Sequence, residues 1–316
     1  MALLTPALGG RTARDVVAAR LTRRDRDVKG IALLLLLLVA AGLTMLILFV
    51  LLTQIVVAAV PVFREQGLGF ITGTIGSNPA EQGIWPGLYG SIFIGLGVVV
   101  VAIPLGIGAA IYLEEYASSR NRLTRLILVN IRNLAGVPAV IYGVLGLIIF
   151  VEWLEPVTAG ETVITAGLTM AVLVLPIIII TAMEAIRAVP QGLRDAGYGV
   201  GASRWEVTRD HVLPYAAPGI LTGTVLSIAR ALGEAAPLIL IGALSGLVPR
   251  TGMTERFTAL PFLIFDFSSR PDRPDAEIGW SNAAAAAGLV LLVLVLFFNA
   301  AAILLRNRFE QRRVGT

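Results

Sequence analysis

The chain has 316 residues, of which 56% are hydrophobic and only 15% are charged. A soluble domain has about 45–50% apolar and about 25% charged residues, so this composition excludes an ordinary soluble domain and indicates an integral membrane protein. The formal net charge is +4 and there is no cysteine, which excludes disulfides, thiol catalysis and cysteine-ligated metals. The one histidine, His211, leaves no histidine cluster to bind a metal.

Six apolar segments are long enough to cross a bilayer as helices, since a crossing needs roughly 20 residues. In chain order they are 31–60, 86–113, 134–154, 162–183, 215–244 and 283–305. The first apolar run begins too late, and is too long, for a cleavable signal peptide. The sequence therefore predicts an all-α polytopic membrane protein, with an N-terminal segment at 1–30 and a six-helix transmembrane domain at 31–316.

The basic residues are unevenly distributed between the two sides of this predicted domain. Residues 1–30, the loops after the second and fourth segments, and the C-terminal tail together hold 19 of the 25 basic residues, and the opposite side holds five. Basic residues concentrate in cytoplasmic loops, so both termini are expected in the cytoplasm. The same distribution argues against nucleic-acid binding, because the positive charge does not form a single face.

The charged connection between the fourth and fifth segments reads EAIRAVPQGLRDAGYGVGASRWEVTRDHVLP, residues 184–214. Its composition predicts two short helices joined by a glycine elbow at Gly199 and Gly201, with Ser203 as the cap of the second helix. Prolines bracket the segment. On periodicity alone it is an amphipathic connector at the membrane surface.

The run D-A-G-Y-x-x-G-A-S-x-W-x₇-L-P within this connection resembles the EAA loop of permeases in bacterial ABC importers. The matching positions are Asp195, Ala196, Gly197, Gly201, Leu213 and Pro214. Asp195 replaces the usual Glu, and Gly197 replaces the second Ala. The resemblance implies a MetI-like type I ABC importer permease fold, and a loop that docks as a coupling helix on a cytoplasmic ATPase. Trp205 either fills a hydrophobic groove of that ATPase or packs under its own loop.

The chain carries no nucleotide-binding motif of its own. The pattern G-x-x-x-x-G-K-[ST] is absent, and the sole lysine, Lys29, is far from any glycine-rich turn. We therefore expect a non-enzymatic subunit without cofactor or catalytic residues, whose partner ATPase binds ATP and Mg²⁺. The acidic pair Glu114 and Glu115 ends the second segment, either as a solvated helix end or as a contact with the ATPase.

The fifth segment contains two charged residues, Arg230 and Glu234, in SIARALGEAAP. Arg230 is about 15 residues beyond Tyr215, roughly 20 Å along a helix, which places it near the bilayer centre. Glu234 follows one helical turn later and is expected to neutralise it in part. A purely structural pair is one interpretation, although such pairs often add little stability. The other is a substrate site, because an arginine fork matches a tetrahedral oxyanion and transporters bind substrate at the midplane.

A carboxylate beside the arginine suits phosphate better than sulfate, because phosphate keeps a P–OH donor near neutral pH. R-A-x-G-E at 230–234 resembles the permeases of phosphate importers, and the following Ala236-Pro237 favours the PstA type over the PstC type. Other stretches agree, IPLGIGAAIYLEEYA at 103–117 and NLAGVPAVIYGVLGL at 133–147 among them. The residue after Glu234 is Ala235, where the family usually has a threonine, so one possible hydroxyl ligand is missing.

This resemblance implies Arg230 and Glu234 as substrate-translocation residues in a bacterial inner membrane protein. It also implies a homologous PstC-type permease, a PstB-type ATPase dimer and an external PstS-type binding protein as partners. A permease for sulfate or molybdate, or the PstC-type subunit itself, remains the alternative. The outer loop 245–281 contains LPFLIF, which lies on the surface, forms a re-entrant turn, or meets a binding protein, whereas 270–274 reads as an exposed turn.

Overall fold

The computed structural model describes residues 28–118, 121–244, 246, 251–274 and 277–314, and it gives the side chains of residues 305, 306 and 308–314 no description. Most of the expected N-terminal segment 1–30, parts of the outer loop 245–281 and the arginine side chains of the tail therefore lie outside the described residues. Within them the chain is helical, and the β contact present is one isolated antiparallel bridge between Thr162 and Arg256.

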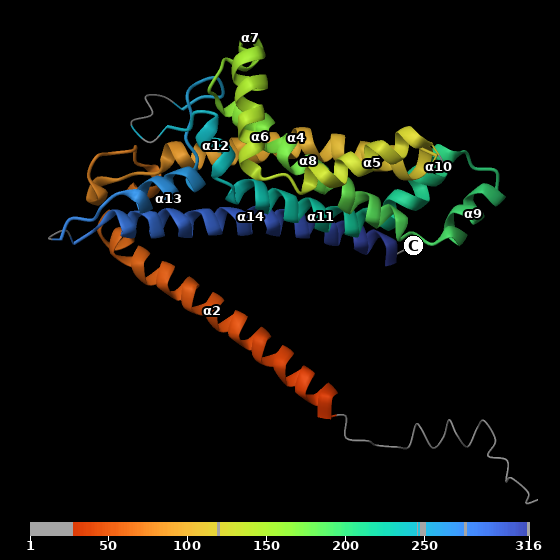
Figure 1. Ribbon diagram of the computed structural model, residues 1–316, viewed down its shortest axis with the longest axis horizontal. Helices are drawn as coiled ribbons and strands as arrows, with labels where there is room; N and C mark the ends of the chain where they lie inside the picture. The colour runs from red at the N-terminus through yellow and green to blue at the C-terminus, as the bar shows by residue number, and fades with distance from the viewer. Residues whose placement is uncertain (1–27, 119–120, 245, 247–250, 275–276, 315–316) are drawn as a thin grey trace, which may run out of the picture. The chain divides into compact units, whose positions relative to one another are not determined.

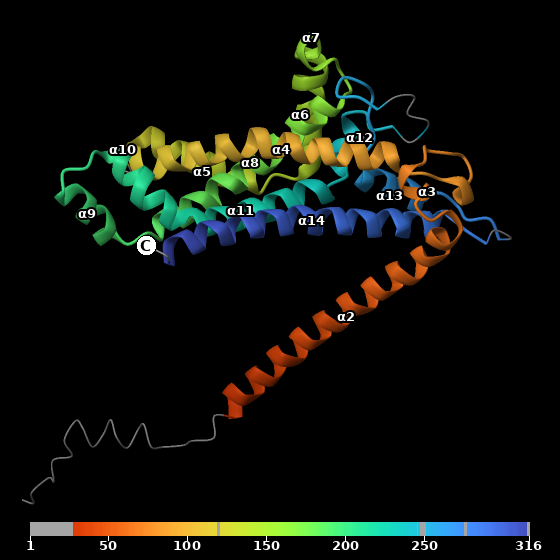
Figure 2. The same cartoon turned by 180° about the vertical axis from the view of Figure 1, so that it is seen from behind.

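Figures 1 and 2 show the helices from two opposite sides. Their bounds are α2 Val28–Gln66, α3 Gly69–Thr72, η1 Pro79–Glu81, α4 Trp85–Ile111, η2 Tyr112–Tyr116, α5 Arg122–Ala135, α6 Ala139–Gly146, η3 Leu147–Trp153, α7 Glu155–Thr158, α8 Val163–Arg187, α9 Gln191–Gly199, α10 Arg204–Val207, η4 Thr208–Val212, α11 Leu213–Gly233, α12 Ala236–Leu240, α13 Leu260–Ser269 and α14 Trp280–Val314. The segments η2, η3 and η4 are π-helical, and η1 is a 3₁₀ turn.

The chain divides into two compact units, residues 1–53 and 54–316. In the first unit the described part is the beginning of α2, residues 28–53, where the leucine-rich side chains are exposed and none is buried. A helix that is apolar on all sides and unburied is typical of a lipid-facing membrane span. The rest of the chain forms the second unit.

The second unit is a bundle with α8 at its centre. Helices α4, α8, α11 and α14 run side by side (Figures 1 and 2), and α8 packs closely on both α4 and α11. Small residues permit this packing: a Cβ added to Gly97 of α4 would lie 3.3 Å from Cα of Gly167 in α8. Close backbone approach through glycine is characteristic of helix packing in membranes, where apolar burial provides little drive for association.

The expected third span, 134–154, is wrong in its shape. Helix α5 begins at Arg122, twelve residues earlier than expected, and the chain bends by 104° between α5 and the α6–η3 segment. The bend falls at Gly136-Val137-Pro138, where Pro138 lacks a backbone donor and drives the residue before it out of the helical region. Among the described residues, five helices are long and apolar enough to cross a membrane, or six if the bent pair forms one span.

The outer apolar stretch LPFLIF forms helix α13, whose Leu260, Leu263 and Phe267 are buried. It packs against α14 and α4, so this helix covers part of the bundle. The expectation of a simple exposed turn at 270–274 is wrong for Arg270. Its guanidinium pairs with Asp266 at 2.6 Å and lies 4.3 Å from the ring centroid of Trp280, because a cation is attracted to an aromatic face.

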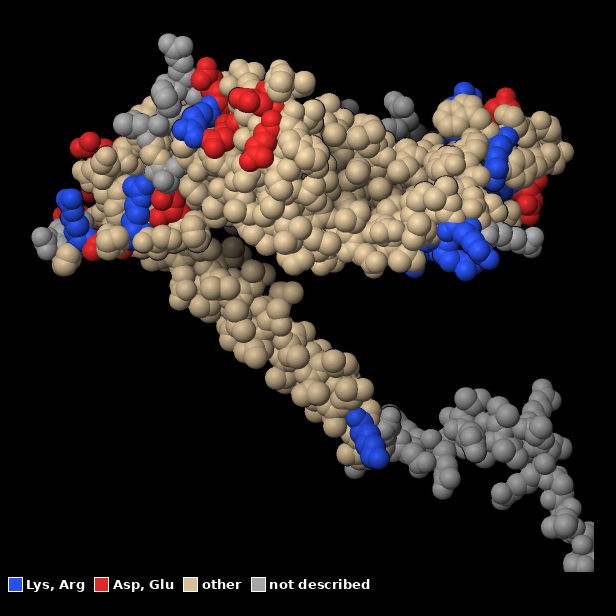
Figure 3. Space-filling model, turned by 45° about the horizontal axis from the view of Figure 1, so that its top comes forward, with Lys and Arg blue, Asp and Glu red and all other residues tan. Residues whose placement is uncertain are grey.

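On the face of the second unit that Figure 3 shows, charged side chains gather at its two ends. In Figure 3 the blue and red residues of this unit cluster at its opposite ends, and an uncharged belt lies between them. Such a belt with charged ends is the arrangement that a bilayer imposes, since charges in its centre are costly. The bundle therefore has the surface of a membrane domain.

Candidate functional site

Arg230 lies in the last turn of α11, and Glu234 follows the end of that helix. The backbone of Glu234 is extended, with φ −93° and ψ 118°, and the short helix α12 begins at Ala236. The expected continuous span 215–244 is therefore wrong. Pro237 explains the break, because its ring in a continuing helix would meet the carbonyl of Gly233 four residues earlier.

The break separates the two charged side chains that were expected to pair. Among the described residues, no ion pair or hydrogen bond joins Arg230 to Glu234. The one-turn spacing that would bring them together requires a helix through both positions, and Glu234 is outside it. In α6, the Tyr142 hydroxyl donates to the carbonyl oxygen of Leu134 at 2.8 Å.

Arg230 lies on a face of α11 that the second unit leaves open. The exposed positions Thr222, Leu226, Arg230 and Gly233 recur at helical spacing, and Leu226 is 65% exposed. The opposite face, with Thr224, Ile228 and Leu232, is buried against neighbouring helices. The guanidinium therefore stands on a surface available to a second subunit or to a passing ligand.

The break itself is well supported by α6. Helix α12 packs on α6, and a Cβ added to Gly143 would lie 2.8 Å from Cα of Pro237. Leu238 and Ile241 join the same buried cluster as Tyr142. The non-helical turn beside Arg230 is thus a fixed part of the fold.

The connection between α8 and α11 has the two-helix form expected from its composition. Helix α9 ends at Gly199, Gly201 takes a left-handed backbone with φ +84°, and α10 starts at Arg204. Ser203 and Glu206 form a capping box: the amide of Glu206 donates to the Ser203 hydroxyl, and the amide of Ser203 donates to the Glu206 carboxylate at 2.7 Å. This bonding lowers the pKa of Glu206 below its ordinary value.

The second half of this connection is continuous with the fifth span. Helix α10 passes through η4 directly into α11, and together they form one helix from Arg204 to Gly233. Pro214 was expected to close the loop, but it lies inside this continuous helix, directly after the π-helical turn η4, and does not end it. A push on α10 therefore acts along the same helix that carries Arg230.

The residues singled out from the EAA-like run fall into two groups. Gly197 is buried, and a Cβ there would lie 2.8 Å from a methyl carbon of Val207, so α9 and α10 need glycine to pack. Asp195, Ala196, Gly201 and Pro214 are exposed, and Asp195 accepts a hydrogen bond from Gln191. Trp205 is 51% exposed, so it does not pack under its own loop, and Leu213 is partly buried.

A buried ion pair holds this connection to the end of the second span. Arg194 of α9 lies 2.8 Å from the Glu115 carboxylate of η2, and the side chains are 12% and 6% exposed. Next to it Glu114 pairs with Arg187, and the guanidinium of Arg204 lies 5.1 Å from the ring centroid of Tyr116. Neither a solvated helix end nor an ATPase contact describes Glu115. The sequence carries no local signal for this pair, because its members are 79 residues apart.

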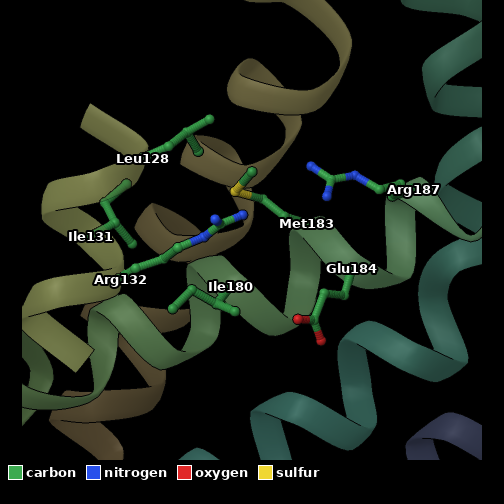
Figure 4. Close-up of a pocket in the computed structure, with 7 residues that line it drawn as sticks. All are labelled: Leu128, Ile131, Arg132, Ile180, Met183, Glu184 and Arg187. Carbon is green, nitrogen blue, oxygen red and sulfur yellow. The ribbon is translucent and has the colours of Figure 1, made fainter. Parts of the chain in front are cut away.

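Two hollows in the second unit are not lined by the charged pair. Figure 4 shows a cavity of about 120 Å³ between α5 and α8, into which Arg132 and Arg187 point from opposite sides of Met183. A larger hollow of about 560 Å³ is lined by Glu152, Glu155, Glu161 and Glu255 with Arg256, which pairs with Glu161. Repulsion by these carboxylates disfavours an anion in the second hollow.

Comparison with known proteins matches most of this architecture. The family described as "Binding-protein-dependent transport system inner membrane component" matches residues 102–314. Among solved structures, a bacterial ABC transporter that imports the acidic polysaccharide alginate is similar over 90% of this chain and 99% of that chain, with TM-score 0.60 and 16% identity. The MetNI methionine ABC transporter is similar over 72% of this chain and 94% of that chain, with TM-score 0.53 and 18% identity. The expected all-α type I importer permease fold is confirmed.

Curated relatives are more similar in sequence. A probable ABC transporter permease, YqgI of Bacillus subtilis (strain 168), is 34% identical over 59% of this chain and 61% of its own length. PstA 1 of Mycobacterium tuberculosis (strain CDC 1551 / Oshkosh), a phosphate transport system permease, is 32% identical over 60% of this chain and 61% of its own. PstC of Mesorhizobium japonicum (strain LMG 29417 / CECT 9101 / MAFF 303099) is 31% identical over 53% and 58%. The chain thus spans about three fifths of the length of these relatives.

Proposed function

The chain belongs to the family of inner membrane components of binding-protein-dependent transport systems, which are non-enzymatic permease subunits of ABC importers, and on that premise we propose that it transports inorganic phosphate. In this proposal it is the PstA-type subunit, and a homologous PstC-type permease provides the other half of the pathway. A PstB-type ATPase dimer supplies the energy, and a PstS-type protein delivers phosphate from outside. Both termini lie in the cytoplasm, as the bias of 19 basic residues against five indicates.

The observation that carries the proposal is the placement of Arg230. Its side chain stands on the open face of α11, beside a helix break that α6 holds in place. Transporters commonly bind substrate at broken helices near the membrane midplane. A partner permease facing this surface would enclose the guanidinium, and an enclosed arginine binds an oxyanion through two parallel hydrogen bonds.

Glu234 complements the arginine as an acceptor. Because it does not pair with Arg230 in the chain, its carboxylate is available to accept a hydrogen bond from the P–OH group of phosphate. Sulfate and molybdate have no such donor at neutral pH and would be repelled by a carboxylate. The pair therefore favours a protonated tetrahedral anion over a fully deprotonated one.

The cytoplasmic connection supports an ATPase partner. Val200 is 85% exposed and Trp205 is 51% exposed, at the tip and on the second helix of the connection. We assign them to a hydrophobic groove of the ATPase, since exposed large apolar side chains beside charges commonly mark protein interfaces. Asp195 and Ala196 are exposed on the first helix of the same connection. ATP and Mg²⁺ bind to that partner in this proposal.

The acidic hollow fits delivery by a binding protein. Four glutamates there raise the energy of a free anion, so phosphate reaches Arg230 from a protein that docks and shields it. This arrangement would favour directed delivery over entry from bulk solution. The acidic hollow lies at the outer end of the protein in the proposed orientation, with both termini in the cytoplasm.

Two alternatives keep a specific observation behind them. The PstC relative, at 31% identity, is nearly as similar as the PstA relative, and the fold alone suits any type I importer. The experiment that discriminates among the substrates is uptake of radiolabelled phosphate, sulfate and molybdate by cells that carry Glu234→Gln. We expect phosphate uptake to fall while the other two anions stay at background. Sulfate or molybdate uptake that depends on this chain, without phosphate uptake that depends on it, would reject phosphate as the substrate. Unchanged phosphate uptake in Glu234→Gln would remove Glu234 from the mechanism.

A further inference from the structure

Arg194 is the best-connected side chain of the cytoplasmic connection. Its Nε and Nη2 donate to one carboxylate oxygen of Glu115, at 3.3 and 2.8 Å. Its Nη1 donates to the carbonyl oxygen of Val189 at 2.7 Å, and Nη2 also donates to that of Ile186 at 2.9 Å. One residue of α9 therefore bonds to the end of α8 and to η2 at once.

Glu115 lies in an unusual stretch of backbone. It belongs to the π-helical turn η2, which continues α4 at its end, and it is one of the buried residues there. Single π-helical turns inside α-helices are rare and frequently occur at functional sites. The turn places a carboxylate of the second span under the connection, although 79 residues separate it from Arg194.

The rest of α9 is held differently. Its backbone packs chiefly on α10 and η4, which belong to the same connection and lead into α11. The ion pair is thus the principal polar tie between α9 and α4. A buried pair with good geometry fixes its partners strongly, because removal of one member leaves an uncompensated charge.

We propose that the Arg194–Glu115 pair is the joint through which displacement of the connection reaches α4. This inference rests on the proposed function, in which an ATPase pushes the connection. With the joint intact, α9 and the end of α4 move as one body, while α10 carries the same displacement into α11. Arg194 and Glu115 are positioning residues, because neither touches substrate or nucleotide in this account.

The chain offers a matched control in the neighbouring pair. Arg187 and Glu114 connect α8 to the same π-helical turn, but the Arg187 side chain is 60% exposed, and exposed pairs contribute little. Arg187→Gln therefore removes an arginine from the same region without loosening α9. Glu115→Gln is the gentler of the two test variants, because it keeps the size of the side chain and its ability to accept from Arg194.

The first measurement reports the joint itself. The natural chain has no cysteine, so Gly199→Cys, where an added Cβ meets nothing within 4 Å, gives a unique spin label on α9. The labelled chain is placed in lipid nanodiscs. There, Arg194→Gln and Glu115→Gln should each increase the mobility of the spin label, whereas Arg187→Gln should not. Unchanged mobility in both test variants would overturn the joint, and this readout does not depend on any substrate.

The second measurement reports transmission. In proteoliposomes with the complete transporter, the test variants should lower the phosphate transported per ATP hydrolysed by at least about tenfold, with the same amount of ATPase co-purified and hydrolysis retained. Arg187→Gln should leave that ratio unchanged. A parallel fall in transport and hydrolysis would assign the pair to folding or docking and reject transmission. If the unmodified transporter moves no phosphate, the proposed function fails, and the spin label still decides whether the joint exists.

Discussion

Arg230 and Glu234 are four residues apart in the sequence, yet the helix that carries Arg230 ends at Gly233 and Glu234 lies beyond it with an extended backbone. The two opposite charges are therefore separate groups in the chain. This separation leaves both side chains with unused hydrogen-bonding capacity next to an open helix face.

Pro237→Ala should weaken transport by allowing the helix to continue. Without the proline ring, α11 can extend through Glu234 and bring its carboxylate one turn from Arg230, where the two would pair. We expect phosphate uptake to fall at least about tenfold, which corresponds to about 1.4 kcal/mol of additional barrier. Pro218→Ala is the matched control, because Pro218 lies within α11 without a break. Equal effects of the two substitutions would contradict a special role for the break.

Gly201→Ala should disturb the elbow of the connection between α8 and α11. A left-handed backbone costs a residue with a side chain about 1–2 kcal/mol, and Gly201 has φ +84°. Local opening of the connection, measured by amide hydrogen exchange, should increase about 5- to 30-fold, and uptake should fall while membrane insertion is unchanged. Gly199→Ala, two residues earlier and within α9, should leave both the exchange and the uptake unchanged.

Much of the helical architecture could be predicted, because a membrane span is recognisable from the apolar composition of its segment alone. The positions of the six apolar segments, the two helices of the connection and the cap at Ser203 all follow from local rules of hydropathy, glycine and capping. What could not be predicted arises from pairs of distant residues or from proline sterics. The 104° bend before α6, the break after Gly233 and the Arg194–Glu115 pair are of this kind.

The roles of Arg230, Glu234 and the EAA-like residues stay predictions, because they came from resemblance and chemistry. The structure alters their basis in one respect. The expected neutralised pair inside an unbroken span is replaced by two charges at a helix break that, in the described part of the chain, do not pair with each other, which favours binding over a structural role.

Ser203→Ala should loosen the start of α10. Loss of an N-cap costs about 1 kcal/mol, so amides of the first turn should exchange about fivefold faster. The cap should also respond to pH. The Ser203 bonds lower the pKa of Glu206, so the contribution of the Glu206 carboxylate is present above its unfolded pKa and is lost as pH falls through the lowered value. If the protection of these amides, relative to exchange in an unfolded chain at the same pH, were the same at neutral pH and in acid below that value, the pH response of the cap would be contradicted.

Trp205→Ala should weaken association with the ATPase and leave the fold intact. Its side chain is half exposed, so truncation should change stability by no more than about 0.5 kcal/mol. A tryptophan buried at the centre of an interface contributes about 2 kcal/mol or more, so affinity for the ATPase should fall about 30-fold in a titration of purified components. Trp153→Ala, also exposed but in η3, should bind the ATPase normally. Equal affinities for the two variants would place Trp205 outside the interface.

The central claim is that an unpaired arginine beside a helix break binds phosphate during its passage. The most direct measurement is uptake of radiolabelled phosphate by cells that carry Arg230→Ala, compared with Arg230→Lys and the unmodified chain at equal membrane abundance. A charge-assisted hydrogen bond contributes about 1.5–3 kcal/mol, so Arg230→Ala should lose at least about tenfold in uptake, and Arg230→Lys should retain part of it. Uptake by Arg230→Ala equal to that of the unmodified chain would contradict the account.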